Sequence, residues 1–525
     1  MGGSALNASV AAPPSRGERE PNADMATLAR GGRLNAFGFI LRLAARLPFL
    51  FIAGRVYGAE ALGRFAYAVL IVEFAAQLSA LGLRRGLAQL LANTKKDHAC
   101  VVADAMLVTL LGSLLFMAIL MVFPRAMFPN SQIHGLDWLL PITVLAVAWT
   151  DISLAALAYR NDVGATVRAR SLVEPWTISI VAFAWQWISL RDGLIIAYVI
   201  SMVAALIAAL VPLVRSYGIP HHWSPDLAGS WRTARKNIPL AAADAVEWAS
   251  RRIDLAVLGL FLSPAFVGIY YVAQQVATLP AKLKTSFEPV LGPVIARNIA
   301  DGDKLAVAKQ VRQVSYWIIA AQAGIALALA LPGRAVMGLV GPHFTGGTAT
   351  IGFLLAAEVI AATAVVSEAA LIYIERHRNM VISLIMLALE AGLATGLILG
   401  MRWLGWDEPH QATGPAVGLC LALAFASIAK SRLLAKRLGA RVSGWRMDIL
   451  YATAAGLVVG IPVRLYLPEI WQLIIGIPLI MVAFGIVVWT TGFGPEDREL
   501  FRLKKKDVEQ LQANEAKAQI ADDII

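Results

Sequence analysis

Ionisable residues gather in one stretch of an otherwise apolar sequence. Residues 244–261 read DAVEWASRRIDLAVLGLF, and the first part of this stretch carries Asp244, Glu247, Arg251, Arg252 and Asp254. On a helix that turns by about 100° per residue, the four other than Arg252 would share an arc of about 80°. An unpaired charge at the centre of a membrane costs at least about 3 kcal/mol. These groups must therefore face one another or a water-filled space.

Neighbouring apolar segments add further cations. Arg42 and Arg46 lie four residues apart, and thus on one face of a helix. Lys282 and Lys284 follow Pro280, which is expected to bend its helix. Guanidinium and ammonium groups match phosphate oxygens well, so the sequence predicts a hydrated cavity that holds an anion. Its predicted binding residues are Arg42, Arg46, Arg251, Arg252, Lys282 and Lys284.

Acidic residues in the apolar segments have two interpretations. Asp244, Glu247 and Asp254 are expected to hold the arginines in place. Carboxylates inside a membrane also carry protons or bind sodium, and the candidates for a cavity or coupling role are Glu73, Asp151, Glu358 and Glu368 together with these three. The structural alternative is that local ion pairs, such as Asp254 with Arg251, only lock helices together. No catalytic residue, metal site or cofactor is predicted, apart from a proton or sodium ion as coupling ion.

Composition defines the class of protein that must position these groups. The chain has 525 residues, of which 58% are hydrophobic and 15% charged, against roughly 25% charged in a soluble protein. Apolar runs of about 20 residues recur throughout, each long enough to cross a bilayer. We therefore predict an all-α polytopic membrane protein. The net charge of +11 is attributed to loops facing an anionic leaflet and not to nucleic-acid binding.

About fourteen transmembrane helices are expected, and the positions of Lys and Arg support this number. The predicted spans are residues 34–57, 62–83, 99–123, 137–159, 169–189, 193–214, 238–262, 265–295, 313–331, 347–374, 380–401, 413–435, 447–467 and 470–491. With the N-terminus inside, 33 Lys and Arg residues fall in inner loops and tails, including the loop from Lys430 to Arg446, and seven fall outside. Basic residues favour the cytoplasmic side, so both termini are predicted to be cytoplasmic.

A weak internal repeat divides the chain. A shift of 205 residues places LGRFAYA (62–68) on VGIYYVA (267–273), and thus Gly63 on Gly268. The repeat predicts two parallel six-helix bundles, an arrangement typical of transporters that bind substrate between halves. The predicted divisions are a tail (1–33), an N-terminal bundle (34–215), a cytoplasmic linker (216–237), a C-terminal bundle (238–437), two additional transmembrane helices (438–492) and a cytoplasmic tail (493–525).

Residues 33–93 carry a resemblance to a known family. The sequence RLNAFGFILRLAARLPFLFIAGRVYGAEALGRFAYAV contains Tyr57-Gly58 and Gly63-Arg64-Phe65, and Leu81-Gly82-Leu83 follows. This pattern resembles the opening of polysaccharide (O-antigen) flippases of the multidrug/oligosaccharidyl-lipid/polysaccharide exporter superfamily. The resemblance implies a protein that moves undecaprenyl-pyrophosphate-linked oligosaccharides to the outer leaflet through a cationic lumen. Many members have twelve helices, and the related lipid II flippases have fourteen.

The predicted function is therefore a flippase of a bacterial inner membrane that serves surface polysaccharide biosynthesis, such as O-antigen (lipopolysaccharide) or exopolysaccharide. Expected partners are the lipid-linked oligosaccharide, membrane lipids and polysaccharide polymerase or export machinery. Three alternatives stay open: a lipid II flippase, a cation-coupled multidrug exporter, and a membrane glycosyltransferase or polymerase. No enzyme is predicted, because the chain has no Walker motif, nucleophile elbow or long extracytoplasmic loop. The sugar unit, coupling ion and oligomeric state are not encoded in these patterns.

Overall fold

The computed structural model describes residues 47–94, 97–160, 162–220, 223–224 and 227–494. Side chains in these ranges are described except at residues 163, 227–228, 230–234, 236, 282–290 and 293. Every regular element of this part of the chain is a helix. The predicted tail 1–33, the start of the first span and most of the tail 493–525 lie outside the described residues.

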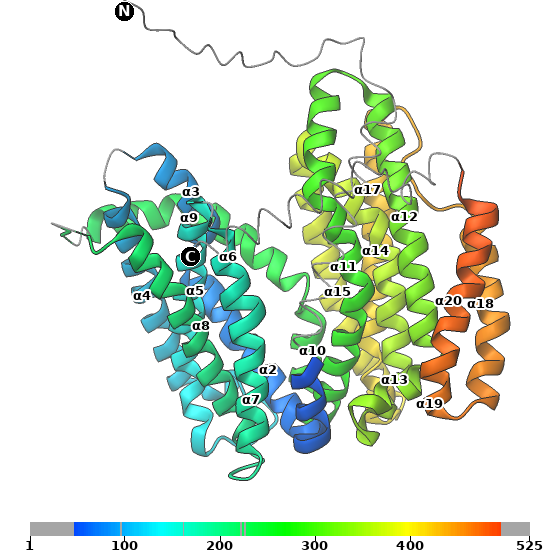
Figure 1. Ribbon diagram of the computed structural model, residues 1–525, viewed down its shortest axis with the longest axis horizontal. Helices are drawn as coiled ribbons and strands as arrows, with labels where there is room; N and C mark the ends of the chain where they lie inside the picture. The colour runs from blue at the N-terminus through cyan, green and yellow to red at the C-terminus, as the bar shows by residue number, and fades with distance from the viewer. Residues whose placement is uncertain (1–46, 95–96, 161, 221–222, 225–226, 495–525) are drawn as a thin grey trace, which may run out of the picture.

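The first group of helices lies on the left of Figure 1. It contains α2 (Gly58–Ser79), α3 (Leu83–Asn93), α4 (His98–Val122), α5 (Thr143–Tyr159), α6 (Val163–Thr166), α7 (Glu174–Trp185) and α8 (Gly193–Tyr217). Within this group α5 packs on α4 and α8, and α7 packs on α8. A left-handed turn at Leu81 and Gly82 (φ +46° and +70°) separates α2 from α3. Asp97 caps α4 by accepting a hydrogen bond from the Ala99 amide.

The second group lies to the right of the first (Figure 1). It contains α10 (Ile253–Phe261), α11 (Pro264–Ala300), α12 (Lys304–Ala330), α13 (Gly333–Val340), α14 (Thr348–Ile374), α15 (Arg376–Trp403), α16 (Glu408–Gln411) and α17 (Gly414–Leu438). Helix α14 is central, because it packs on α11, α12 and α17. Buried Tyr270, Tyr316 and Trp317 belong to a large apolar core that includes residues of both groups.

A helical hairpin at the C-terminal end of the described chain packs on α12 of the second group. It consists of α18 (Met447–Tyr466), α19 (Glu469–Trp471), α20 (Ile477–Val487) and the flanking turns Gln472–Gly476 and Val488–Gly492. Small residues allow close approach at this contact: Gly456 packs against Leu327 and Gly460 against Leu331. At the other end, the Arg446 guanidinium lies 3.8 Å from the Tyr316 ring centroid.

All fourteen predicted spans coincide with helical segments, as far as their residues are described. Ten helices of the described chain are long and apolar enough to cross a membrane. The first of them, Leu47–Asn93, contains the described part of the predicted span 34–57 and all of 62–83. Three predicted spans, 169–189, 238–262 and 265–295, are not among the ten. The spans 169–189 and 265–295 carry charges such as Arg170 and Lys282, whereas 238–262 is also divided by a helix break that leaves α10 with nine residues.

The segment predicted as one helix over 238–262 is two helices. Helix α9 (Leu227–Ala249) begins inside the predicted linker, and α10 begins after a break at Ser250–Arg252, where Arg252 has φ −139°. Helix α9 packs on α2, α3 and α4 of the first group, whereas α10 packs on α11, α15 and α17 of the second. The break thus separates a segment that packs mainly on the first group from one that packs mainly on the second. The prediction of an unbroken helix here was wrong.

The two groups meet where α2 crosses α11. A Cβ atom on Gly63 would lie 1.7 Å from the Pro264 carbonyl oxygen, and one on Gly268 would lie 2.0 Å from that of Ala59. The shift of 205 residues relates Ala59 to Pro264 and Gly63 to Gly268, so each contact has its exchanged counterpart. Such reciprocal contacts are the signature of a twofold axis. These two contacts agree with the predicted parallel repeat, whose axis would pass between the two glycines.

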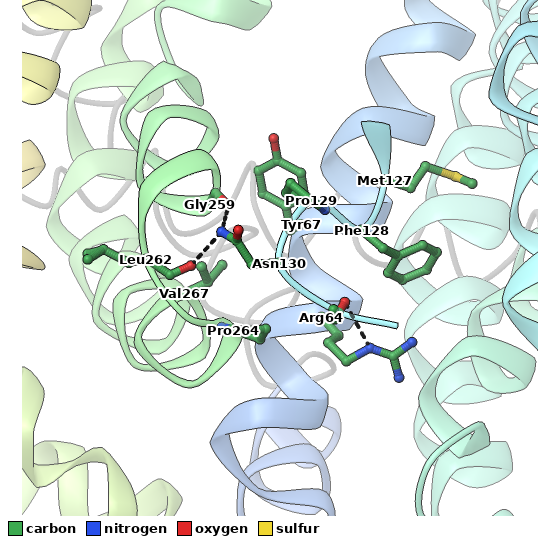
Figure 2. A pocket seen from close by; sticks show the side chains of 12 residues that line it. Arg64, Tyr67, Met127, Phe128, Pro129, Asn130, Gly259, Leu262, Pro264 and Val267 are labelled. Atoms are coloured by element: carbon green, nitrogen blue, oxygen red, sulfur yellow. Dashed lines mark hydrogen bonds between the residues drawn. The ribbon is translucent and has the colours of Figure 1, made fainter. Parts of the chain in front are cut away.

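Contacts near the same crossing close one end of the molecule. We call this end, which contains residues 123–137 and 331–347, the outer end, after the orientation that the charge pattern predicts. Asn130 Nδ2 donates to the carbonyl oxygens of Gly259 and Leu262, both at 2.9 Å, and Figure 2 shows its side chain pointing at them. The hollow beside it has about 20 Å³, roughly the room that one water molecule needs.

An equivalent contact joins the first helix of the first half to an outer segment of the second half. Arg55 Nε donates to the Leu339 carbonyl oxygen at 3.0 Å, and a Cβ on Gly54 would meet Val340 at 2.2 Å. Residues 54–57 and 259–262 are equivalent under the 205-residue shift. The end of each first helix is thus held by an outer segment of the other half. In Figure 1 the two groups converge at this end and diverge toward the opposite, inner end.

Candidate functional site

The acidic face of α9 points to arginines on α3. Arg85 Nε lies 2.7 Å from Asp244 Oδ1, and its Nη2 pairs with Glu247. Arg84 Nη2 lies 3.9 Å from the same Asp244 oxygen. The Asp244 side chain is buried, whereas both arginines are partly exposed. The acids of α9 are therefore partnered mainly by a helix of the first group.

Arg251 and Arg252 lie at the break between α9 and α10. Arg251 Nη2 is 3.1 Å from Glu247 Oε1, and Arg252 Nη2 is 3.6 Å from Glu73 Oε2 on α2. Their side chains are 60% and 33% exposed, so neither guanidinium is sealed inside its ion pair. We call the following set the inter-group charge cluster: Glu73, Arg84, Arg85, Asp244, Glu247, Arg251 and Arg252. Its four arginines and three acids leave a formal charge of +1.

Asp254 points the other way, into the second group. It accepts hydrogen bonds from Tyr270 Oη at 2.7 Å and from Gln274 Nε2 at 3.1 Å. Glu390 lies on α15, a helix that packs on α10, which carries Asp254. Glu390 is fully buried, and neither of its carboxyl oxygens has a hydrogen-bond partner among the described residues. We call Asp254 and Glu390 the buried acid pair. An ionised carboxylate buried without a partner is strongly disfavoured, which makes Glu390 the less stable member of this pair in its charged form.

A third polar cluster lies in the first group. Arg170 Nη1 is 2.8 Å from Glu174 Oε2, and its Nη2 pairs with Asp151. The buried Tyr198 hydroxyl has no hydrogen-bond partner among the described atoms. Tyr198 lies on α8, which packs on α2 of the same group and on the turn that carries Arg170. Polar groups therefore run from the interior of the first group to the joint between the groups.

Glu358 and Glu368 both lie on α14. Glu368 Oε2 is 2.8 Å from Lys430 Nζ, which also donates to Ser383 Oγ at 3.0 Å. Lys430 belongs to α17 and is buried, so its assignment to an inner loop was wrong. Opposite charge on a facing helix allows it to lie there. Glu358 is half-buried on the same helix.

The predicted cation set can be followed only in part. Arg42 and Arg46 lie outside the described residues, and Lys282 and Lys284 lie on α11 with side chains outside the described set. Of the three predicted supporting acids, Glu247 holds Arg251, whereas Asp244 holds the α3 arginines. Asp254 is hydrogen-bonded to Tyr270 and Gln274.

Arg84, Arg85 and Arg170 were not singled out from the sequence. One signal was available for the first two: the acids at 244 and 247 share a helix face, and Arg84-Arg85 directly follows a predicted span. Arg170 lay at the edge of a predicted span, where a basic residue is expected to face the inner surface. Glu174 lies four residues after Arg170, a spacing that places the two on one helix face, whereas Asp151 on α5 is known as a partner only from the packing.

The chain has the fold of a multi-pass membrane protein in which two helix groups meet, with charged side chains at the joint. Solved structures of other membrane proteins have a similar fold. The lipid II flippase MurJ in an inward closed conformation has a TM-score of 0.65 at 13% identity, covering 88% of this chain and 97% of its own. An inward-facing MATE-family transporter of the MOP superfamily has a TM-score of 0.61 at 13% identity, with 76% and 94% covered.

A MOP-superfamily transporter from Pyrococcus furiosus also matches, with a TM-score of 0.53 at 14% identity over 80% of this chain and 96% of its own. The fold is therefore that of the MOP superfamily. The family model described as "Polysaccharide biosynthesis protein" matches residues 38–299, and the chain belongs to this family. The resemblance drawn from residues 33–93 is thereby confirmed. No curated protein matches the sequence significantly.

Proposed function

We propose that the chain is a flippase that moves an undecaprenyl-pyrophosphate-linked oligosaccharide across a bacterial inner membrane for surface polysaccharide biosynthesis. Membership of the polysaccharide biosynthesis family and the MOP fold support this proposal. The observation that carries it is the position of Arg251 and Arg252. Both are partly exposed at the helix break that joins the two groups, where one ligand can touch both halves.

The pyrophosphate is the part of the cargo that this site would recognise. Arginine binds phosphate oxygens with two parallel hydrogen bonds, and these bonds are stronger when charged. In the proposal, cargo oxygens replace Glu247 and Glu73 as partners of Arg251 and Arg252. Arg42, Arg46, Lys282 and Lys284 would supply further charge. When the headgroup leaves, Glu247 and Glu73 would form their ion pairs with Arg251 and Arg252 again, so that binding would be reversible.

The transport cycle would be a rocking motion of the two halves, which we place at residues 34–215 and 238–437. The closed outer end and the divergence of the groups toward the inner end support an inward-directed starting state. Opening to the other side requires that the contacts of Asn130 and Arg55 break. Because Arg252 and Glu73 belong to different groups, cargo binding there would be linked to this motion.

The buried acid pair is our candidate for coupling to a proton or sodium gradient. Asp254 lies two residues after Arg252, so a change in the ionisation of Asp254 would change the electrostatic potential at the Arg252 guanidinium. Among the described residues, Glu390 has no hydrogen-bonding partner to stabilise its charge. Binding and release of a proton or sodium ion at this pair would therefore change the electrostatic energy of the helix break.

The alternatives predict different observations. A lipid II flippase would have the same fold, and similarity to MurJ at 13% identity does not distinguish a lipid II cargo from an oligosaccharide cargo. The match to the polysaccharide biosynthesis family favours the oligosaccharide. A cation-coupled drug exporter would bind cations where this chain places arginines. A membrane glycosyltransferase or polymerase would transfer sugar as a pure protein in vitro.

The test is complementation of a strain that lacks its polysaccharide flippase. Arg251→Gln and Arg252→Gln together should abolish surface polysaccharide at matched protein levels and leave lipid-linked repeat units in the inner leaflet. Arg441→Gln, an exposed inner-loop arginine with no described partner, is the matched control and should leave polysaccharide unchanged. Normal surface polysaccharide in the double variant would exclude the proposed cargo site.

A further inference from the structure

A hollow opens between the second group and the helical hairpin at the outer end. It has a volume of about 510 Å³, in the range of small-molecule sites. Arg334 on α13 lines one side, and Arg464 of α18 with Glu469 of α19 lines the other. The hollow is thus built by two parts of the chain more than a hundred residues apart.

The charges around the hollow are unequal. Arg334 Nε lies 3.0 Å from Glu469 Oε1, so these two groups neutralise each other. Within the described part of the chain, the guanidinium of Arg464 has no ion-pair or hydrogen-bond partner. The polar side chains beside it are already used: Thr345 and Gln472 donate to backbone carbonyls. The hollow therefore offers one unused guanidinium and a formal charge of +1.

Aromatic residues fix the depth of this site. Tyr466 and Trp471 flank the turn from α18 to α19 and are 83% and 48% exposed. Tyrosine and tryptophan exposed on membrane helices lie at the level of the lipid headgroups. Exposed Leu465 and Ile470 lie in the same turn. A cation at this depth, next to apolar surface, faces phosphodiesters and not the acyl region.

We propose that this hollow binds the phosphodiester headgroup of an anionic phospholipid from the outer leaflet. Arg464 would bind the phosphate oxygens. Arg334 would contribute a second guanidinium when its ion pair with Glu469 breaks. The bound lipid would bridge α13 and α18 and so hold the hairpin against the second group. This site lies at the outer end, away from the inter-group charge cluster, and does not rest on the identity of the cargo.

Native mass spectrometry of the full-length protein in a non-ionic detergent tests the proposal. Titration with phosphatidylglycerol should give more one-lipid adduct than titration with zwitterionic phosphatidylcholine of the same chains. Arg464→Gln should lower the phosphatidylglycerol adduct at least fivefold. Arg125→Gln is the matched control, because Arg125 is an exposed outer arginine far from the hollow along the chain, and it should leave the adduct unchanged.

Removal of the competing carboxylate should change the amount of lipid adduct in the opposite direction. Glu469→Gln frees Arg334 and should raise the phosphatidylglycerol adduct severalfold, an effect that misfolding does not produce. Equal adducts in wild type and Arg464→Gln, or equal binding of the two lipids, would overturn the proposal. Displacement of the lipid by equimolar inorganic phosphate or pyrophosphate would overturn the lipid as ligand and assign the hollow to a free anion.

Discussion

Arg252 and Glu73 form an ion pair between the two helix groups, with 3.6 Å between Nη2 and Oε2. Arg252 lies at the start of α10, which packs in the second group, and Glu73 lies in the middle of α2 in the first. Both side chains are about one-third exposed. A ligand that competes for Arg252 therefore also changes how the two groups are held together.

The Arg252→Gln variant should reduce cargo transport by roughly ten- to a hundredfold. A hydrogen bond to a charged group contributes about 1.5–3 kcal/mol, and glutamine keeps the side-chain volume but not the charge. Flipping of a fluorescent lipid-linked oligosaccharide in proteoliposomes measures the rate. The charge-swapped pair Arg252→Glu with Glu73→Arg is the discriminating control. Full activity of that pair would mean that Arg252 serves only the ion pair.

Asn130 should act as a latch of the outer end. Its side chain donates two hydrogen bonds to the other group, and each is worth about 1 kcal/mol. Asn130→Ala should therefore raise the outward-open population by roughly thirtyfold. The measurement is labelling of Val267→Cys, which lines the hollow beside Asn130, by an impermeant thiol reagent in a Cys100→Ser, Cys420→Ser background.

The control for the latch is Gln186→Ala. Gln186 lies at the same end of the molecule, but its amide donates only to the nearby Phe183 carbonyl. Labelling of Val267→Cys should stay at the background rate in this variant. A labelling rate that does not rise in Asn130→Ala would show that the glycine crossing alone keeps the outer end closed.

The helices could be predicted from the sequence because each apolar run is long enough to span a bilayer. The repeat was also visible, since Gly63 and Gly268 occupy equivalent places in two similar heptapeptides. That these two glycines touch could not be predicted. A repeat relates residues in the two halves, but the position of its axis depends on which helices pack at the interface. Only the close contacts of α2 with α11 place the axis there.

The charge clusters were less predictable than the helices. The charged stretch 244–254 was expected to need partners, but their identity could not be read from it: Asp244 pairs with Arg85 of α3, about 160 residues earlier, and Arg252 with Glu73 of α2, about 180 residues earlier. Helical spacing says which residues share a face and does not say what that face meets. Lys430 shows the same limit: its position near a helix end favoured an inner loop, and its burial depends on Glu368 of a facing helix.

Glu390→Gln should separate coupling from stability. Glutamine has the same shape and can form hydrogen bonds without a charge, so the loss of a buried unpartnered carboxyl group should leave the melting temperature unchanged or higher. Transport driven by a proton or sodium gradient should fall at least tenfold. Proteoliposomes with each gradient, measured beside Glu60→Gln, an exposed acid with no described partner, give the comparison. Gradient-driven transport at the wild-type rate would remove Glu390 from the coupling site.

Arg446 should determine whether the helical hairpin stays attached at its inner end. Its guanidinium stacks on Tyr316 and donates to the Gly492 carbonyl oxygen at 3.1 Å and to Gln313 Oε1 at 3.3 Å. Cation–π and charged hydrogen-bond contributions together predict a loss of about 2–4 kcal/mol in Arg446→Ala. Hydrogen exchange should then accelerate in α18 and α20 and not in α14. Arg446→Lys keeps the charge but loses the planar stacking, so it should show an intermediate rate; equal exchange in all three proteins would mean that the small-residue contacts of Gly456 and Gly460 hold the hairpin by themselves.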